Sequence, residues 1–239
     1  MATQVGAAGA SVERDRAFFF AMAMAIVVTT ISGFTLQFAA GRSSLASPWW
    51  VHLHGVTAVG WLALYATQNF LVFRGSFVAH QRLGMFASVY LAWMVVAGLS
   101  ITVLSAAAHR IPPFFEPNVF LVMDWLNTAV FAGFTWAGVA LRAQPDWHRR
   151  LMLCGAVQVM TPGIGRLLPL PLMGTWILWS IWLAMMVYLS VAIAYDLLTR
   201  GRVHPAYLWG VGVITVTVAA MRPIAFSPPV LALTETLTG

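Results

Sequence analysis

Three histidines stand where apolar runs of this sequence begin, and each has arginines beside it. His80 lies in RGSFVAHQRLG, His148 in RAQPDWHRRLM and His204 in TRGRVHPAYLWG. The first two segments share the pattern R-x5-H-x-R-L, and the third keeps the arginine and the histidine without that order. Histidines presented by neighbouring helices can ligate a haem iron or a metal ion. The recurrence therefore predicts a cofactor or metal site near one face of a helical bundle.

Two kinds of cofactor fit this inner set of polar residues. In the first, His80 and His148 are the axial ligands of a haem b, and Arg82 or Arg150 pairs with the haem propionates, since guanidinium groups bind carboxylates at two points. In the alternative, His80, His148 and His204 hold zinc with help from Asp196, because zinc commonly takes three histidines and a water. A third interpretation places these residues against lipid phosphates or at helix starts.

A second polar set is expected at the opposite membrane face. In WWVHLHG the deeper histidine is His54, and Asp124 and Asn127 share one face of their helix because they are three residues apart. Counting along the runs places Arg166 and Arg222 at a similar depth. A charge in the hydrocarbon costs about 2.5–3.5 kcal/mol and usually has a partner. We therefore expect Asp124 to contact Arg166, with Arg222 in reach of the same cavity.

The excess positive charge of this outer cavity would suit a carboxylate or a phosphate. Two alternatives stand beside that interpretation: Asp124 and Arg166 form an ion pair that only locks two helices, or the arginines extend to the outer headgroups. His148 precedes Arg166 by 18 residues, and His204 precedes Arg222 by the same number. Five helical turns of about 27 Å would place each pair on one face. The matching spacings indicate duplicated helix pairs.

Composition fixes the class of protein. Sixty percent of the 239 residues are hydrophobic and 8% are charged, whereas soluble domains average about 25% charged residues. All 13 basic residues are arginines, and without a lysine amine no retinal Schiff base can form. The single cysteine allows no intramolecular disulfide. The net charge of +6 comes from arginines at membrane edges, so we expect no nucleic-acid partner.

The chain is predicted to be an all-α, multi-pass membrane protein with seven transmembrane helices. A span needs about 20 apolar residues, and Pro and Gly break the sequence between the runs. We expect a disordered polar tail at 1–16, a transmembrane domain at 17–226 and a short outer tail at 227–239. The seven runs are 17–39, 50–73, 82–107, 118–141, 150–169, 174–198 and 205–225.

Arginine placement predicts the orientation. Nine arginines fall in the N-terminal tail and in alternate loops, and cytoplasmic loops carry the excess of positive charge. The N-terminus is therefore expected in the cytoplasm and the C-terminus outside, in a bacterial inner membrane. The nine are Arg14, Arg16, Arg74, Arg82, Arg142, Arg149, Arg150, Arg200 and Arg202.

Two resemblances accompany these motifs. The stretches VHLHGVTAVGWLALYATQNFLVFRGSFVAHQRLG, WHRRLMLCGAVQVMTPGIGRLLP and YDLLTRGRVHPAYLWG resemble a family of bacterial multi-pass membrane proteins of unknown function, over roughly 50–210. The chain is more distantly similar to transmembrane ascorbate-type b cytochromes, which hold haems between histidines of alternate helices. That likeness implies His80 and His148 as the inner pair and His54 as one outer ligand. The fourth position is Asp124 or Asn127 instead of histidine.

The leading functional hypothesis is a haem- or metal-binding redox protein of the membrane. One alternative is a zinc-dependent hydrolase acting on a lipid, and another is a non-catalytic subunit of a larger membrane complex. Besides the lipid bilayer, the expected partners are a quinone, a lipid or another membrane protein.

Overall fold

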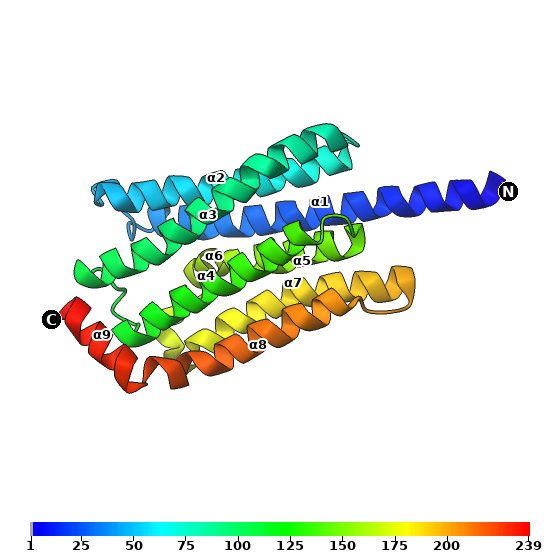
Figure 1. The fold of residues 1–239 in the computed structure, drawn as a ribbon. Helices are drawn as coiled ribbons and strands as arrows, with labels where there is room; N and C mark the ends of the chain where they lie inside the picture. Colours follow the sequence, from blue (N-terminus) through cyan, green and yellow to red (C-terminus); the bar gives the residue numbers. More distant parts are fainter. Residues whose placement is uncertain (1) are drawn as a thin grey trace.

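The computed structural model describes residues 2–239, with side chains from Ser11 onward, and it is built from helices throughout that part (Figure 1). Long helices lie side by side in a bundle, and the two ends of the chain lie at opposite ends of it. The elements are α1 (Ala2–Ala39), α2 (Trp49–Phe73), α3 (Phe77–Ala107), α4 (Pro117–Ala140), α5 (Pro145–Val159), α6 (Thr161–Leu167), the short 3-10 turns η1 (Leu170–Leu172) and η2 (Gly174–Trp176), α7 (Ile177–Arg200), α8 (Pro205–Ala225) and α9 (Pro228–Thr238).

Six helices within the described residues are long and apolar enough to cross a membrane, so the prediction of seven is corrected. These spans are Ser11–Ala39, Trp49–Phe73, Phe77–Ala107, Pro117–Ala140, Gly174–Arg200 and Pro205–Ala225. The predicted fifth span, 150–169, is divided between α5 and α6. With 15 residues, α5 is about 22 Å long, which is less than the roughly 30 Å of a bilayer core.

The division between α5 and α6 follows from the sequence TPGIG. Pro162 has no backbone N–H to continue the hydrogen bonding of α5 and lies in the first turn of α6. The Thr161 hydroxyl donates to the Gln158 carbonyl, 2.5 Å away, at the end of α5. The two pieces together still carry the chain from one end of the bundle to the other (Figure 1).

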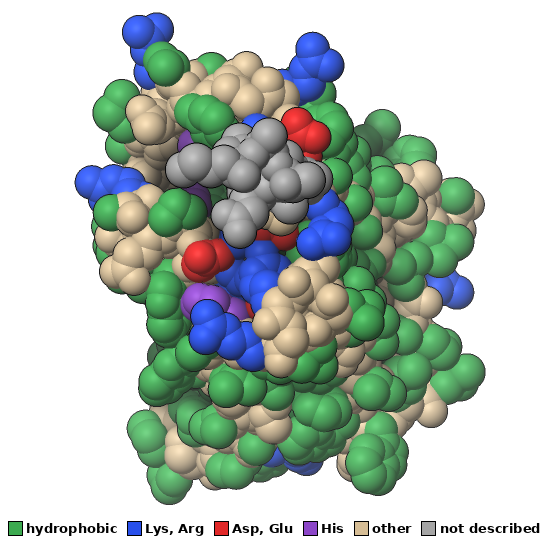
Figure 2. Space-filling model, turned by 90° about the vertical axis from the view of Figure 1, so that its right-hand side faces the viewer, with side chains coloured by type: hydrophobic (Ala, Val, Ile, Leu, Met, Phe, Trp, Pro, Cys, Tyr) green, Lys and Arg blue, Asp and Glu red, His purple; other side chains and the backbone are tan. Residues whose placement is uncertain are grey.

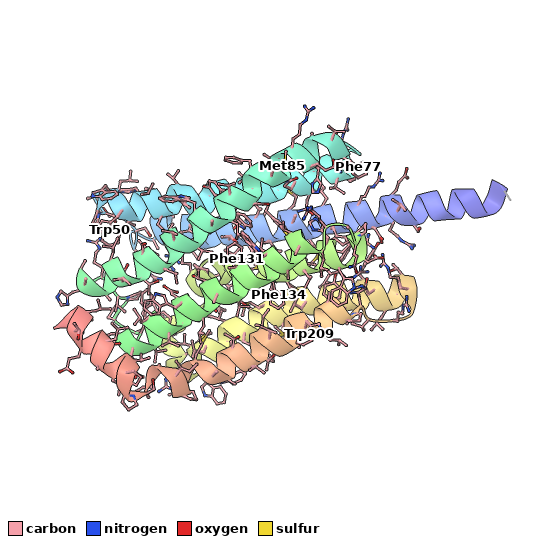
Figure 3. The ribbon with its side chains drawn as sticks, viewed as in Figure 1. Trp50, Phe77, Met85, Phe131, Phe134 and Trp209 are labelled. Carbon is pink, nitrogen blue, oxygen red and sulfur yellow. The ribbon has the colours of Figure 1, made fainter. Side chains whose placement is uncertain are left out.

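The interior of the bundle is built around α5. This helix contacts α1, α4, α7 and α8, and Cys154 and Val157 have no exposed surface. The outer helices instead direct large apolar side chains outward, as lipid requires. In Figure 3, Phe131 and Phe134 lie inside, with 3% and 7% of their surface exposed, whereas Met85 and Trp209 lie outside, with 69% and 63% exposed.

A close approach of two glycines joins α1 to α6. A Cβ added to Gly33 would lie 2.2 Å from the carbonyl oxygen of Gly163. A Cβ added to Gly163 would lie 2.6 Å from the Cα of Thr30. Small residues let two helix backbones approach closely. Membrane helices commonly pack in this way, because in lipid no hydrophobic force drives helices together.

Both predicted tails have helical backbone. α1 begins at Ala2, and the predicted disordered tail at 1–16 falls largely on residues whose side chains lie outside the described part. The predicted outer tail at 227–239 contains α9, which packs against α3, α4 and α8.

Candidate functional site

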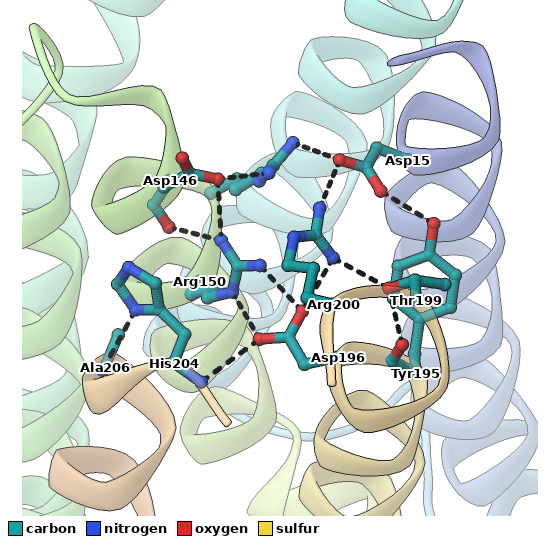
Figure 4. Close-up of polar contacts among 10 residues, drawn as sticks. Asp15, Asp146, Arg150, Tyr195, Asp196, Thr199, Arg200, His204 and Ala206 are labelled. Carbon is teal, nitrogen blue, oxygen red and sulfur yellow. Dashed lines mark hydrogen bonds and ion pairs between the residues drawn. The ribbon is translucent and has the colours of Figure 1, made fainter. Parts of the chain in front are cut away.

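A buried ion pair lies where α5 and α7 meet, at the end of the bundle that holds most arginines (Figure 4). Arg150 Nε donates to Asp196 Oδ2 over 2.8 Å, and its Nη2 donates to Oδ1 over 2.6 Å. Neither side chain has exposed surface. Two-point pairing of this kind fixes the relative position of the two helices as well as neutralising both charges.

Further charged groups extend this pair into a network. Arg150 Nη1 also donates to the carbonyl and the carboxylate of Asp146, over 2.9 and 3.0 Å. Arg200 donates to Asp196 over 2.9 Å and also pairs with Asp15 of α1. Arg149 lies 2.9 Å from Asp15 and pairs with Asp146. Three arginines thus balance three aspartates, and Figure 2 shows blue and red side chains gathered at this end.

The network corrects one expectation about Arg150. A haem propionate would need a free guanidinium, but Arg150 is fully engaged by Asp196 and Asp146. Burial would raise the pKa of Asp146, but the hydrogen bond from Arg150 and the charges of Arg149 and Arg150 outweigh burial and lower that pKa below its ordinary value. Arg82, the other predicted propionate partner, is exposed.

His204 acts at the start of α8. The Ala206 N–H donates to its Nδ1 over 3.2 Å, so the imidazole caps the helix. The His204 ring also packs edge-on against Trp147, with 5.0 Å between ring centres. Burial, followed by the charge of Arg150, lowers the pKa of His204. A neutral Nδ1 that accepts from the backbone is the form that this cap needs.

The alternative zinc set is not assembled. Within the described residues, no three or more His, Cys, Asp or Glu side chains are grouped so that they could hold a metal ion. The physical reason is that Asp196 is bound by Arg150 and Arg200, while His204 is turned to its own helix. The predicted zinc ligands His80, His148, His204 and Asp196 are therefore not grouped as one metal site in the described part of the chain.

His80 and His148 do come together. Their ring centres are 6.1 Å apart and their planes are inclined by 77°. His148 Nδ1 lies 2.8 Å from the carbonyl oxygen of Gly138, and the buried Nδ1 of His80 has no hydrogen-bond partner among the described residues. The two histidines occupy equivalent positions in the first turns of α3 and α5, which begin at the same end of the bundle (Figure 1).

The outer residues are arranged differently from the expectation. Asp124 accepts from the Thr102 hydroxyl over 3.3 Å. Arg166 donates to the Pro162 carbonyl over 2.8 Å, and its guanidinium lies 4.0 Å from the ring centre of Phe34. Among the described side chains, Asp124 and Arg166 form no ion pair within 4.0 Å. The predicted direct ion pair is therefore not formed, and Arg166 belongs to α6, beyond the break that ends α5 at Val159.

Arg222 lies outside the predicted cavity. It pairs with Glu116 over 3.4 Å, and both side chains are about half exposed, at 44% and 51%. His148 and Arg166 belong to separate helices, whereas His204 caps the start of α8 and Arg222 lies in the last turn of the same helix. The matching 18-residue spacings in the sequence therefore do not correspond to equivalent structures.

The remaining predicted outer residues, Asn127 and His54, are half-buried. Asn127 Oδ1 accepts from Gln158 Nε2 over 2.6 Å, which joins α4 to α5. The Nδ1 of His54 is buried without a hydrogen-bond partner in the described part of the chain. Sequence reasoning did not single out Gln158, Thr102, Asp15 or Tyr195, and it used Arg200 only to orient the chain. The scarcity of acidic residues was the one sign in the sequence that could have pointed to Asp15, since the chain has only seven.

Comparisons with known proteins add no relative. No protein-family model matches the chain, and neither a curated protein nor a solved structure matches it. The two resemblances drawn from the motifs thus have no support from these comparisons. The chain is a multi-pass helical membrane protein with six candidate spans in its described part.

Proposed function

We propose that this chain is a membrane redox protein that holds the iron of a haem b between His80 and His148. The distance of 6.1 Å between the two ring centres carries the proposal. Metal–nitrogen bonds of about 2.0–2.1 Å place the ring centres of two imidazoles on opposite sides of a metal roughly 6 Å apart. The observed spacing is therefore compatible with one metal atom between the rings.

The hydrogen bond of His148 supports this assignment. With Nδ1 donating to the Gly138 carbonyl over 2.8 Å, the lone pair of the ring is left on Nε2. Metal-bound histidines usually donate their second nitrogen to a carbonyl or a carboxylate in this way, which fixes both tautomer and ring orientation. The carbonyl comes from α4, so three helices contribute to the site.

The setting of the pair suits a haem near one membrane face. His80 and His148 are about half-buried at the arginine-rich end. Arg82 lies two residues after His80 in α3 and is exposed. An exposed arginine can meet a propionate carboxylate without giving up another ion pair. When bound, haem would supply one-electron chemistry, and the protein's part is to hold and orient it.

The surroundings favour the inner membrane of a bacterium with the arginine-rich end in the cytoplasm, because positive charge gathers on that side. Arg14, Arg74, Arg82, Arg142 and Arg202 are exposed at this end. We expect the electron partner to be a quinone or another membrane protein. Asp196 and His204 are engaged with Arg150 and the Ala206 N–H, which disfavours a zinc hydrolase built on them.

The proposal is tested by haem content. The full chain, produced in cells supplied with a haem precursor, is purified as wild type, His80→Ala, His148→Ala and His52→Ala, and haem is measured per polypeptide. His52 is exposed at the other end of the bundle, where its ring contacts the Leu45 carbonyl, so it is the matched control. We expect His80→Ala and His148→Ala each to lose most of the haem and His52→Ala to retain it. Full haem in both site variants would reject the site.

A further inference from the structure

A crevice of about 350 Å³ opens at the arginine-rich end, between α1 and the turn from α2 to α3. It is lined by Glu13, Arg16, Phe73, Arg74 and Gly75. Gly75 has a φ of 73°, in the left-handed region that favours glycine, and it turns the chain back into α3. The space where its Cβ would lie is 4.0 Å from Arg16 Nη1. The turn thus brings Arg74 beside an arginine from another helix.

The crevice carries positive charge that no ion pair among the described residues neutralises. Arg16 and Arg74 contribute two positive charges and Glu13 one negative charge, which leaves one positive charge in excess. None of the three forms an ion pair within 4.0 Å with another described residue. Their neighbours Asp15 and Arg149 are by contrast paired. The crevice therefore matches a ligand with a single negative charge.

An aromatic wall continues from this crevice along the membrane-facing side. Phe73 stacks on Phe20 of α1, with 5.1 Å between ring centres and 14° between planes. Phe20 also contacts Phe70, which lies one turn before Phe73 in α2, at 5.9 Å between ring centres. Phe73 and Phe70 remain 41% and 46% exposed. Because α1 leaves this end and α2 ends at it, with Phe73 its last residue, the wall leads from the charged rim toward the middle of the membrane.

Arg16 is also held in place. Its guanidinium carbon lies 4.8 Å from the ring centre of Phe77, the residue that begins α3 and is labelled in Figure 3. Stacking on an aromatic face is a favourable arrangement for arginine. It leaves the N–H groups at the edge of the guanidinium free to donate to an oxyanion.

From the charge and the wall together, we infer that this crevice is a binding site for an anionic phospholipid. The phosphodiester, with its single negative charge, lies between Arg16 and Arg74, where guanidinium groups bind phosphate at two points. One acyl chain lies along Phe73, Phe20 and Phe70. The inference is independent of the haem, since it uses none of the residues at His80 and His148.

The experiment uses the purified full chain in detergent, and native mass spectrometry counts bound lipid. The probes are phosphatidylglycerol and phosphatidylcholine with identical acyl chains. The variants are Arg16→Gln with Arg74→Gln, the control Arg42→Gln with Arg110→Gln, and Glu13→Gln. The control removes the same charge from exposed loops at the opposite end. Circular dichroism verifies that each variant is folded.

We expect the wild type to retain phosphatidylglycerol in preference to phosphatidylcholine. Each arginine near an anionic lipid contributes about a fivefold factor in affinity, so the Arg16→Gln, Arg74→Gln variant should bind phosphatidylglycerol about 25-fold more weakly. The Arg42→Gln, Arg110→Gln control should bind like the wild type, and Glu13→Gln should bind more tightly. Equal losses in the two double variants would overturn the proposal. Displacement of the lipid by millimolar inorganic phosphate would also overturn it, by showing that a free anion suffices.

Discussion

Arg150 of α5 and Asp196 of α7 form a two-point ion pair in which neither side chain is exposed. Around them, Asp15, Asp146, Arg149 and Arg200 complete a set of charges that sums to zero. The network joins α1, α5 and α7, and the backbone N–H of His204, just before α8, lies 3.4 Å from Asp196 Oδ2. It therefore determines how the elements meet at the end of the bundle that presents His148.

The first prediction concerns that buried pair. Asp196→Asn and Arg150→Met should each lower the free energy of unfolding, by up to about 3–5 kcal/mol, because each leaves a buried charge with only one, partly exposed partner: Asp146 for Arg150 and Arg200 for Asp196. The double variant Arg150→Met, Asp196→Leu should recover more than half of the loss, since no buried charge is then left from this pair. Unfolding in mixed micelles followed by circular dichroism gives these values.

The exposed pair of Arg222 and Glu116 is the control. Its side chains are 44% and 51% exposed, so Arg222→Gln should cost less than about 1 kcal/mol. A cost as large as that of Asp196→Asn would show that burial does not govern the strength of these pairs. A double variant Arg150→Met, Asp196→Leu whose free energy of unfolding is as low as that of the single variants would contradict the first prediction.

The second prediction concerns pH. Because burial and the charge of Arg150 lower the pKa of His204, its helix cap is fully effective above the unfolded pKa of about 6.5. The cap is lost as the pH falls through the lower pKa of the folded state, when Nδ1 takes up a proton and can no longer accept from Ala206. The melting temperature should therefore fall as the pH is lowered below about 6.5.

His204→Asn separates this effect from others. Asparagine caps helices at least as well as the neutral imidazole does and does not titrate, so the variant should show a flatter stability profile across the same range. Asp146 acts in another range, because its lowered pKa contributes stability that is lost only below about pH 4. An unchanged slope in His204→Asn would count against the cap as the titrating element.

The third prediction concerns the contact of α1 with α6. In Gly33→Ala the new methyl group would lie 2.2 Å from the Gly163 carbonyl oxygen, and the backbones must separate. Such overpacking costs about 1–3 kcal/mol, and thermal unfolding should show it. Gly133→Ala is the matched control, since nothing lies within 4 Å of its added Cβ. Equal melting temperatures of the two variants would contradict the close packing.

The apolar runs of the sequence predict most of the fold. The run at 118–141, for example, corresponds to α4 at Pro117–Ala140, because a stretch that must lie in lipid is recognisable from composition alone. The run at 150–169 is predicted less well, since Pro162 acts on hydrogen bonds, which hydropathy does not record. The sequence PG within that run was the available sign of a break.

Site residues are predicted where local patterns determine them. The R-x5-H-x-R-L repeat predicted that His80 and His148 lie together, and their ring centres are 6.1 Å apart. Arg150 was misplaced because its partner Asp196 is 46 residues away and no local pattern connects them. Asp124 and Arg166 were matched by depth, but depth gives no information on the direction of a side chain around its helix.

The central claim, a haem between His80 and His148, is tested most directly by the reduced-minus-oxidised absorption spectrum of the purified wild-type chain. Expression in cells supplied with a haem precursor ensures that haem is available. The account predicts a sharp, reversible Soret shift and the α-band of a six-coordinate b-type haem at one haem per polypeptide, and its loss in His148→Ala. A folded wild-type protein without these bands would contradict the account, as would a spectrum that is unchanged in His148→Ala.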